Sequence, residues 1–228
     1  FRGKDGQVRV FRPDENAKRL QRSALRLSME PVPSDIFLEA VDNVLKANAE
    51  FLPPYGHGAS MYLRPLLIGS GPRMGVQPAD EFKFILMVLP VGAYYKGGLE
   101  SVPALVMEDF DRAAPNGTGH VKAAGNYAAG MLAGMKAKEE GYPINLYLDA
   151  REHKYIDEFG TSNFVAIKGN SYVTPNSSSV LPSITNMSLM TLAEDLGMTV
   201  EQRPVEFTEV PEFDGIAACG TAVVVTPI

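Results

Sequence analysis

The sequence predicts an α+β protein built from two domains, and three observations lead to this prediction. Segments with helical periodicity and segments typical of strands follow one another without strict βαβ alternation, which disfavours a doubly wound sheet. The length of 228 residues suits one large or two modest domains. A stretch rich in glycine and tyrosine, PVGAYYKGG, separates two groups of elements. We expect one domain at 1–92, a connecting loop at 93–100 and a second domain at 101–228.

The first group of elements combines two helices with extended segments. FRGKDGQVRVF predicts a hairpin, because Lys4-Asp5-Gly6 is a favoured turn sequence. RPDENAKRLQRSALRLSM predicts an amphipathic helix, and a second helix is expected from an N-cap at Ser34 to near Asn48. SMYLRPLLIGS and FKFILMVLP then predict two strands.

The second group begins near Ser101. Strands are expected in SVPALVMED, INLYLDA and NFVAIKG, with a hairpin turn at GNSYVTPN. Residues 122–140 predict a helix or a passage from strand to helix, and PSITNMSLMTLAEDLG predicts a helix that ends at Gly197. MTVEQRPV and GIAACGTAVVVTPI are typical of strands.

Composition and charge exclude several classes of protein. A net charge of −6 disfavours a nucleic-acid-binding protein. Neither a membrane-spanning run nor a signal peptide is visible. The single cysteine, Cys219, excludes an internal disulfide and fits a reducing compartment, so we expect a cytoplasmic protein. The histidines and Cys219 lack the spacing of a metal site, and we expect no metal. The chain opens on Phe1 and closes on TAVVVTPI, which we interpret as missing flanking segments.

A single lysine, Lys122, lies among small residues in GHVKAAGNYA. It could be a surface lysine at the start of a helix, or a nucleophile in a cofactor cavity. Burial and nearby cations disfavour the charged amine and would permit the second role. A Schiff base between lysine and pyridoxal phosphate is a common use of such an amine. That cofactor also requires an anion site for its phosphate, a partner for its ring nitrogen and a donor to its ring oxygen.

The sequence offers candidates for each requirement, and each has an ordinary structural alternative. The phosphate could be held by Arg64, by Thr221 and by the backbone N–H groups of Ile184 and Thr185 at a helix start. A buried arginine needs an anion, although an internal salt bridge would also satisfy Arg64. Further along the chain, the ring nitrogen could pair with Glu158, and the ring oxygen could accept from Tyr127. Taken singly, each of these two residues is more often a surface glutamate or a half-buried core tyrosine.

The spaced motifs together resemble those of the fold-type IV pyridoxal-phosphate enzymes, and most closely the branched-chain amino-acid aminotransferases. The motifs are, in order, FLPPYGHGASMYLRPLLIGS, VLPVGAYYKGG, GHVKAAGNYA, IDEFGTSNFVAIKG, TPNSSSVLPSITNMSL and CGTAVVVTP. The resemblance covers essentially the whole chain. It implies a small domain at 1–92, an interdomain loop at 93–100 and a large pyridoxal-phosphate-binding domain at 101–228, without the family's outermost N- and C-terminal segments.

The resemblance also implies a role for each matching residue. Lys122 matches the Schiff-base lysine, Glu158 the partner of the pyridine nitrogen, and Tyr127 the donor to the ring oxygen. The matches to the phosphate site are Arg64, Ile184, Thr185 and Thr221. The backbone of Thr221 and Ala222 matches the site for the substrate carboxylate, and Tyr94 and Thr161 match the border of the side-chain pocket.

The implied reaction is transamination between leucine, isoleucine or valine and 2-oxoglutarate, in a homodimer. From charge and composition we expect that the protein binds no nucleic acid and no membrane. Two alternatives within the fold type are a D-amino-acid aminotransferase and an aminodeoxychorismate lyase, and a third is a non-catalytic truncated scaffold. Some members carry a Cys-x-x-Cys redox pair, whose positions here are Val223 and Thr226. We therefore expect no thiol regulation of that kind.

Overall fold

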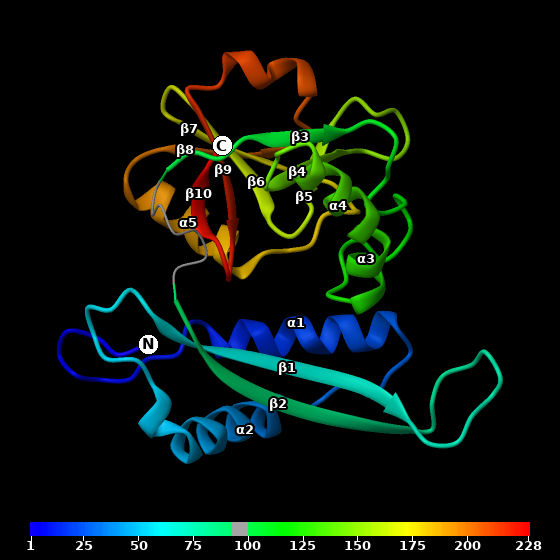
Figure 1. Ribbon diagram of the computed structural model, residues 1–228, viewed down its shortest axis with the longest axis vertical. Helices are drawn as coiled ribbons and strands as arrows, with labels where there is room; N and C mark the ends of the chain where they lie inside the picture. Colours follow the sequence, from blue (N-terminus) through cyan, green and yellow to red (C-terminus); the bar gives the residue numbers. More distant parts are fainter. Residues whose placement is uncertain (93–99) are drawn as a thin grey trace. The chain divides into compact units, whose positions relative to one another are not determined.

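The computed structural model describes residues 1–92 and 100–228 (Figure 1). The chain divides into two compact units, Phe1–Tyr94 (unit 1) and Tyr95–Ile228 (unit 2). This division falls inside the segment 93–100 that the sequence suggests as a connecting loop. Within the described residues, none of the helices combines the length and the apolar character that crossing a bilayer requires.

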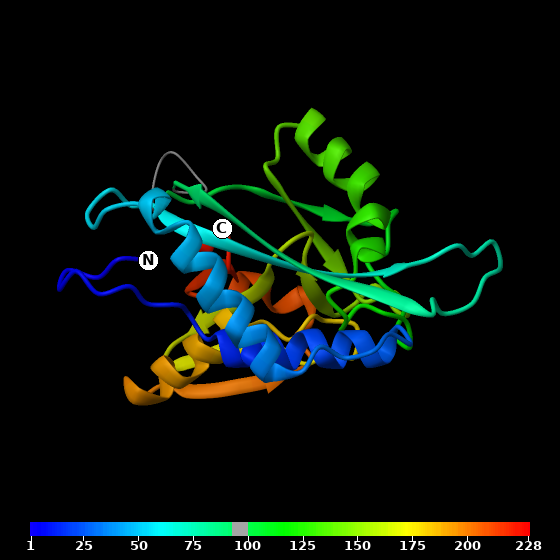
Figure 2. The ribbon, with the colours of Figure 1, turned by 90° about the horizontal axis from the view of Figure 1, so that it is seen from below.

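Unit 1 pairs a long β-hairpin with two amphipathic helices. Its elements are α1 (Pro13–Arg26), α2 (Ser34–Ala47), the short 3-10 helix η1 (Ala49–Phe51), β1 (Ser60–Ser70) and β2 (Glu81–Val91). β1 and β2 are antiparallel along their full length. Both helices pack on one face of this hairpin (Figure 2), since one apolar core joins Ala17, Phe37 and Val41 to Leu63, Leu67 and Phe84.

Two details of unit 1 differ from the sequence-based expectation. The hairpin expected at residues 1–11 is represented by one isolated antiparallel bridge, between Arg2 and Val8. Ser34 is the first residue of α2 rather than its N-cap, which is Pro33. The Ser34 hydroxyl instead accepts a hydrogen bond from Gln21 Nε2 at 3.2 Å and so ties α2 to α1.

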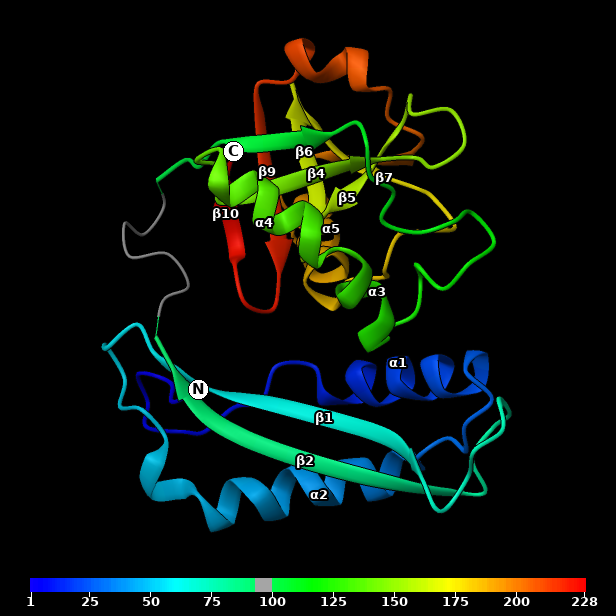
Figure 3. The ribbon, with the colours of Figure 1, turned by 45° about the vertical axis from the view of Figure 1, so that its right-hand side comes forward.

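Unit 2 contains a mostly antiparallel sheet, which has eight strands in the part of the chain that the structure describes (Figure 3). The strands are β3 (Ala104–Met107), β4 (Ile144–Leu148), β5 (Ile156–Phe159), β6 (Asn163–Lys168), β7 (Ser171–Pro175), β8 (Thr199–Arg203), β9 (Gly215–Gly220) and β10 (Val224–Pro227). The order is β10-β9-β6-β5-β4-β3, and β7 pairs with both β6 and β8. Only β3 with β4 and β7 with β8 are parallel. This mixture confirms the α+β prediction.

Helices cover the sheet of unit 2 by burying small and aromatic side chains. They are α3 (Ala124–Ala129), α4 (Met131–Glu139), α5 (Ile184–Asp195) and the 3-10 helix η2 (Phe207–Glu212). Ala133 of α4 packs against Tyr147, and Ala193 of α5 packs in a cluster with Tyr172 and Cys219. The sequence did not predict β5 or η2, and β7 forms where the sequence suggested a hairpin turn at GNSYVTPN. The helix expected at 122–140 is divided at Gly130 into α3 and α4 and begins after Lys122.

The strand register brings three distant connections to one end of this sheet. Glu158 lies opposite Asn163 in the β5–β6 pair, and Asn163 lies opposite Cys219 in the β6–β9 pair. The β5–β6 turn and the β9–β10 turn therefore lie at the same end. β7 runs antiparallel to β6, so the segment 176–183 that leads to α5 starts at that end as well. We call this end of the sheet the loop end.

Candidate active site

Lys122 lies in the short connection before α3, with its amine beside a tyrosine hydroxyl. Its Nζ donates to Tyr127 Oη at 2.7 Å and lies 5.2 Å from the centre of the Tyr127 ring. The side chain is exposed rather than enclosed in the cavity that the sequence suggested. The reason is local, since Ala123, Ala124 and Gly125 are too small to cover a four-carbon side chain.

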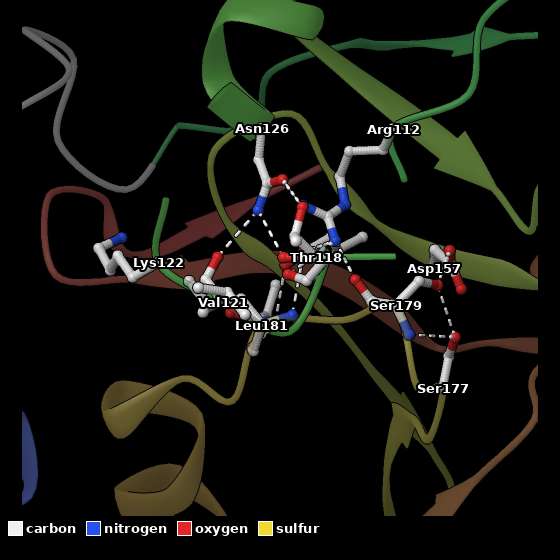
Figure 4. A network of polar contacts seen from close by, with 12 residues as sticks. Arg112, Thr118, Val121, Lys122, Asn126, Asp157, Ser177, Ser179 and Leu181 are labelled. Carbon is white, nitrogen blue, oxygen red and sulfur yellow. Dashed lines mark hydrogen bonds and ion pairs between the residues drawn. The ribbon is translucent and has the colours of Figure 1, made fainter. Parts of the chain in front are cut away.

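The connection that carries Lys122 is fastened by Asn126 on α3. The Asn126 Nδ2 donates to the carbonyl oxygens of Thr118 and Val121 at 2.7 and 2.8 Å, and its Oδ1 accepts from Thr118 Oγ1 at 2.8 Å. Figure 4 shows Asn126 pointing from α3 toward Thr118 and Val121, with Lys122 at the edge of this network. One amide side chain thus fixes the backbone on the N-terminal side of the lysine.

Glu158, on β5, is a buried carboxylate with three hydrogen-bond or ion-pair partners. Its Oε1 lies 2.9 Å from Arg112 Nη2 and accepts from the Leu181 N–H at 3.1 Å. Its Oε2 accepts from Asn163 Nδ2 at 3.0 Å. A carboxylate offers about four acceptor positions, so Oε2 retains room for one more donor.

Burial changes the pKa of Glu158 more than its hydrogen-bond and ion-pair partners do. Loss of water raises the pKa of Glu158 to about 7, while Arg112 and the Leu181 N–H lower it. Asp157, its neighbour on β5, also raises this pKa, and Lys122 lowers it. The carboxyl therefore exchanges its proton near neutral pH, as acid–base groups in active sites often do.

A small pocket opens beside Glu158 at the loop end. Its lining includes Asn126, Tyr127, Glu158, Thr161, Asn163 and Leu181. Residues from α3, β5, the β5–β6 turn, β6 and the segment before α5 therefore surround one space. This arrangement places the acceptor position of Glu158 and the tyrosine that contacts Lys122 around the same pocket.

The N-terminus of α5 presents unpaired backbone donors. Ser183 is the N-cap, and its Oγ accepts from the Asn186 N–H at 3.2 Å. Among the described residues, none accepts a hydrogen bond from the N–H groups of Ile184 or Thr185. Two free donors at the positive end of a 12-residue helix suit an anion such as phosphate.

The remaining candidates lie in several places. Thr221 and Ala222 are exposed in the β9–β10 turn, and Thr161 is exposed in the β5–β6 turn, so all three belong to the loop end. Tyr94 lies outside the described residues. Arg64 belongs to β1 of unit 1.

Arg64 differs from the sequence-based expectation of a buried cation. Its side chain is exposed, because it lies on the face of the hairpin opposite the one that α1 and α2 cover. Its guanidinium lies 5.1 Å from the centre of the Tyr62 ring, a cation–π contact. The internal salt bridge considered for Arg64 is not among the ion pairs of the described residues.

Sequence reasoning missed several residues that build this site. Arg112, Asn126 and Asn163 each contact the loop before α3 or the Glu158 carboxylate. Arg112 offered one usable signal, since it is the only basic side chain in the run DRAAPNGTG that precedes Lys122. The two asparagines offered none, because their importance depends on the register of β5 and β6 and on the fold of the loop.

Comparison with known proteins identifies the family of this chain. The family model described as amino-transferase class IV matches residues 1–228. The chain is 49% identical over 231 residues to the branched-chain-amino-acid aminotransferase of Helicobacter pylori strain J99, covering 100% of this chain and 68% of that protein.

Solved structures give the same result. The branched-chain amino acid aminotransferase of Escherichia coli matches with a TM-score of 0.85 and 32% identity, over 96% of this chain and 70% of that one. That of Thermobaculum terrenum in its PLP form matches with a TM-score of 0.84 and 26% identity, over 100% and 72% of the two chains. The chain therefore belongs to the class IV aminotransferases and, among them, to the branched-chain amino-acid aminotransferase family.

Proposed function

We propose that the loop end of unit 2 binds pyridoxal 5′-phosphate and uses it to transfer amino groups between branched-chain L-amino acids and 2-oxoglutarate. The products are branched-chain 2-oxo acids and glutamate. The observation that carries this proposal is the grouping, around one end of one sheet, of the Lys122–Tyr127 contact, the buried Glu158 carboxylate and the free donors that begin α5.

The residues of unit 2 fit this cofactor in their donors and acceptors. A phosphate needs N–H donors, and the first two N–H groups of α5 have no acceptor among the described residues. A protonated pyridine nitrogen needs an acceptor, and Glu158 Oε2 has one position left. An aldehyde needs an amine, which Lys122 supplies. When bound, the cofactor supplies an electron-accepting ring that stabilises negative charge at the substrate α-carbon.

The resemblance to the family, together with these donors and acceptors, supports a role for each residue. Lys122 holds the cofactor through its amine and, once released, moves a proton from the substrate α-carbon. Its contact with Tyr127 Oη fixes the position of the amine. Glu158 keeps a proton on the pyridine nitrogen, and Tyr127 donates to the ring oxygen. The backbone of Ile184 and Thr185 and the hydroxyl of Thr221 hold the phosphate, together with Arg64.

The substrate side of the proposal involves the turns of the loop end. The backbone of Thr221 and Ala222 binds the substrate carboxylate, and Thr161 and Tyr94 border the side-chain pocket. A pocket that distinguishes substrates by methylene groups yields only modest preferences among leucine, isoleucine and valine. We further propose that the protein works as a homodimer in the cytoplasm, where a reducing environment suits the buried free thiol of Cys219.

The decisive experiment replaces the lysine. In the chain loaded with pyridoxal phosphate, Lys122→Ala should abolish the absorbance band of the lysine-bound cofactor and the transamination of L-leucine with 2-oxoglutarate. Lys168→Ala is the matched control, because Lys168 pairs with Glu212 at the surface of unit 2 and should leave both signals intact. A band that persists in Lys122→Ala would refute the assignment.

Substrate profiling tests the reaction itself. Turnover with L-leucine and none with D-alanine or aminodeoxychorismate is the expected pattern. A preference for either of the latter two compounds would assign a different reaction within the fold type. A colourless protein that ignores added pyridoxal phosphate would support the non-catalytic scaffold.

A further inference from the structure

Arg112 is a buried cation whose charge faces the Glu158 carboxylate. The two side chains are 8% and 5% exposed, and Arg112 Nη2 lies 2.9 Å from Glu158 Oε1. The same nitrogen donates to the backbone carbonyls of Gly119, at 3.1 Å, and Ser179. Arg112 therefore joins the loop before Lys122, the segment before α5 and the carboxylate of β5 at one point. Figure 4 shows its side chain pointing toward Ser179.

The backbone around Arg112 is built for this close approach. A β-carbon at Gly119 would overlap the Ser179 carbonyl oxygen and would lie 2.7 Å from Arg112 Nη2. Only glycine leaves room for the guanidinium to reach both carbonyls. The Nε of Arg112 is buried and has no acceptor among the described residues.

The positive charge of Arg112 affects the ionisation of Glu158 because the Glu158 carboxyl is buried away from water. Burial alone favours the protonated carboxyl, and the guanidinium is the strongest of the neighbours that oppose it. The ionisable groups around the carboxyl come from several elements, namely Arg112, Lys122, Tyr127, Asp157 of β5 and Cys219 of β9. Of these, only Arg112 and Lys122 carry positive charge, and Arg112 alone makes an ion pair with Glu158 among the described residues.

We propose that Arg112 is a positioning residue for transamination, whose guanidinium keeps the Glu158 carboxylate ionised and directed into the pocket. This inference rests on the proposed role of Glu158 as partner of the pyridine nitrogen. A carboxylate can accept the N–H of a protonated pyridine ring, whereas a carboxylic acid leaves that nitrogen unprotonated. Arg112 thus acts on the reaction through Glu158 and without contacting the substrate.

The first test measures the Glu158 carboxyl directly, before cofactor is added. The chain is labelled with δ-13C-glutamate, and the Glu158 resonance is identified by its loss in Glu158→Gln. Arg112→Gln keeps a donor for the carbonyls but removes the charge, so the titration midpoint of Glu158 should rise by about one pH unit or more. Arg203→Gln removes an arginine that pairs with Glu201 and Glu209 elsewhere in unit 2, and should leave the midpoint unchanged.

Arg112→Lys restores the charge without the fork and should return the midpoint part of the way to the wild-type value. If Arg112→Gln fails to fold, Arg112→Met carries the test, because it also removes the charge. A midpoint equal to that of the wild type in whichever of these two uncharged variants folds would overturn the inference.

The second test uses the chain loaded with pyridoxal phosphate. In Arg112→Gln the acid limb of the kcat profile should move to higher pH, with cofactor content and KM for L-leucine retained. At pH 7 kcat should fall about fivefold or more, since a rise of one unit reduces the ionised fraction from about a half to about a tenth.

The two proposals fail in different ways. Normal turnover in Glu158→Gln would remove the proposed role of Glu158, whatever Arg112 does. Impaired turnover in Glu158→Gln, combined with a wild-type pH profile in Arg112→Gln, would overturn the inference about Arg112 alone. A loss of stability without a shifted profile would likewise reduce Arg112 to a structural residue.

Discussion

Two of the arginine–glutamate pairs of unit 2 have the same chemistry and different surroundings. Arg112 and Glu158 lie beside the pocket and are nearly inaccessible to water. Arg203 and Glu209 join β8 to η2, with side chains 33% and 22% exposed and a shortest contact of 2.7 Å. Glu209 Oε1 accepts a second hydrogen bond from Arg203 Nη1 at 2.9 Å, so this pair is bidentate.

The pKa values of the two glutamates are shifted in opposite directions. Hydrogen bonds from Arg203 hold the pKa of Glu209 below its ordinary value, whereas burial raises the pKa of Glu158 to about 7 in spite of Arg112. The partner is an arginine in both cases, so the access of water decides whether the pKa of the glutamate is raised or lowered. A glutamate becomes a group that titrates near neutral pH when its arginine compensates only part of the cost of burial.

The largest difference between the pairs should appear in catalysis. In the chain loaded with cofactor, Glu158→Gln should retain pyridoxal phosphate but lose on the order of 100-fold or more in kcat, because a neutral amide cannot hold the proton on the pyridine nitrogen. Glu209→Gln should keep the wild-type rate. Steady-state assays with L-leucine and 2-oxoglutarate measure both, and a near-normal rate in Glu158→Gln would remove the functional distinction between the pairs.

The pH dependence of stability should carry opposite signs at the two sites. The folded-state pKa of Glu158, about 7, lies above its ordinary value of 4.5, so its contribution is fully present below pH 4.5 and is lost as pH rises through 7. A rise from 4.5 to about 7 corresponds to about 3 kcal/mol of the free energy of unfolding. Glu209 has a lowered pKa, so its contribution is lost as pH falls.

Urea denaturation of the wild type and Glu158→Gln at pH 5 and pH 8 checks this contrast. The free energy of unfolding of the wild type should decrease more between these two values than that of the variant. Equal slopes for the two proteins would mean that Glu158 titrates as an ordinary carboxyl.

The contrast between the pairs also shows what the sequence could predict. The sequence predicts β1 at 60–70 and the helix α5 near 182–197 because these signals are local, and the spaced motifs taken together predict the family. The burial of Glu158 was not predictable in this way. It depends on the pairing of β5 with β6, and no separate sequence signal marks β5.

Arg64 shows the opposite error. An arginine in an apolar strand suggested burial, but within unit 1 the helices α1 and α2 pack on one face of the hairpin, and Arg64 lies on the other face. Alternation along a strand tells which residues share a face. It does not tell whether another element covers that face.

The buried pair of Arg112 and Glu158 should require the close backbone approach at Gly119, whereas the exposed pair of Arg203 and Glu209 has no such requirement. Gly119→Ala introduces a methyl group into the space between Arg112 and the Ser179 carbonyl and should lower the free energy of unfolding by about 1–3 kcal/mol. Gly134→Ala is the matched control in α4, where a β-carbon meets no atom within 4 Å. It should raise stability by about 0.5–1 kcal/mol. If both variants were equally stable, the close approach at Gly119 would not constrain the loop.

The smallest effect should come from removing the charge of the exposed pair. Glu209 also completes a capping box with Glu206, accepting from its backbone N–H at 2.9 Å, and glutamine can accept this bond equally well. Glu209→Gln therefore isolates the ion pair with Arg203 and should cost less than about 1 kcal/mol, since partly exposed pairs are screened by water and salt. The cost should shrink further when urea denaturation is repeated in 1 M NaCl. A loss as large as that caused by Gly119→Ala, and insensitive to salt, would show that water screens this pair no better than the buried one.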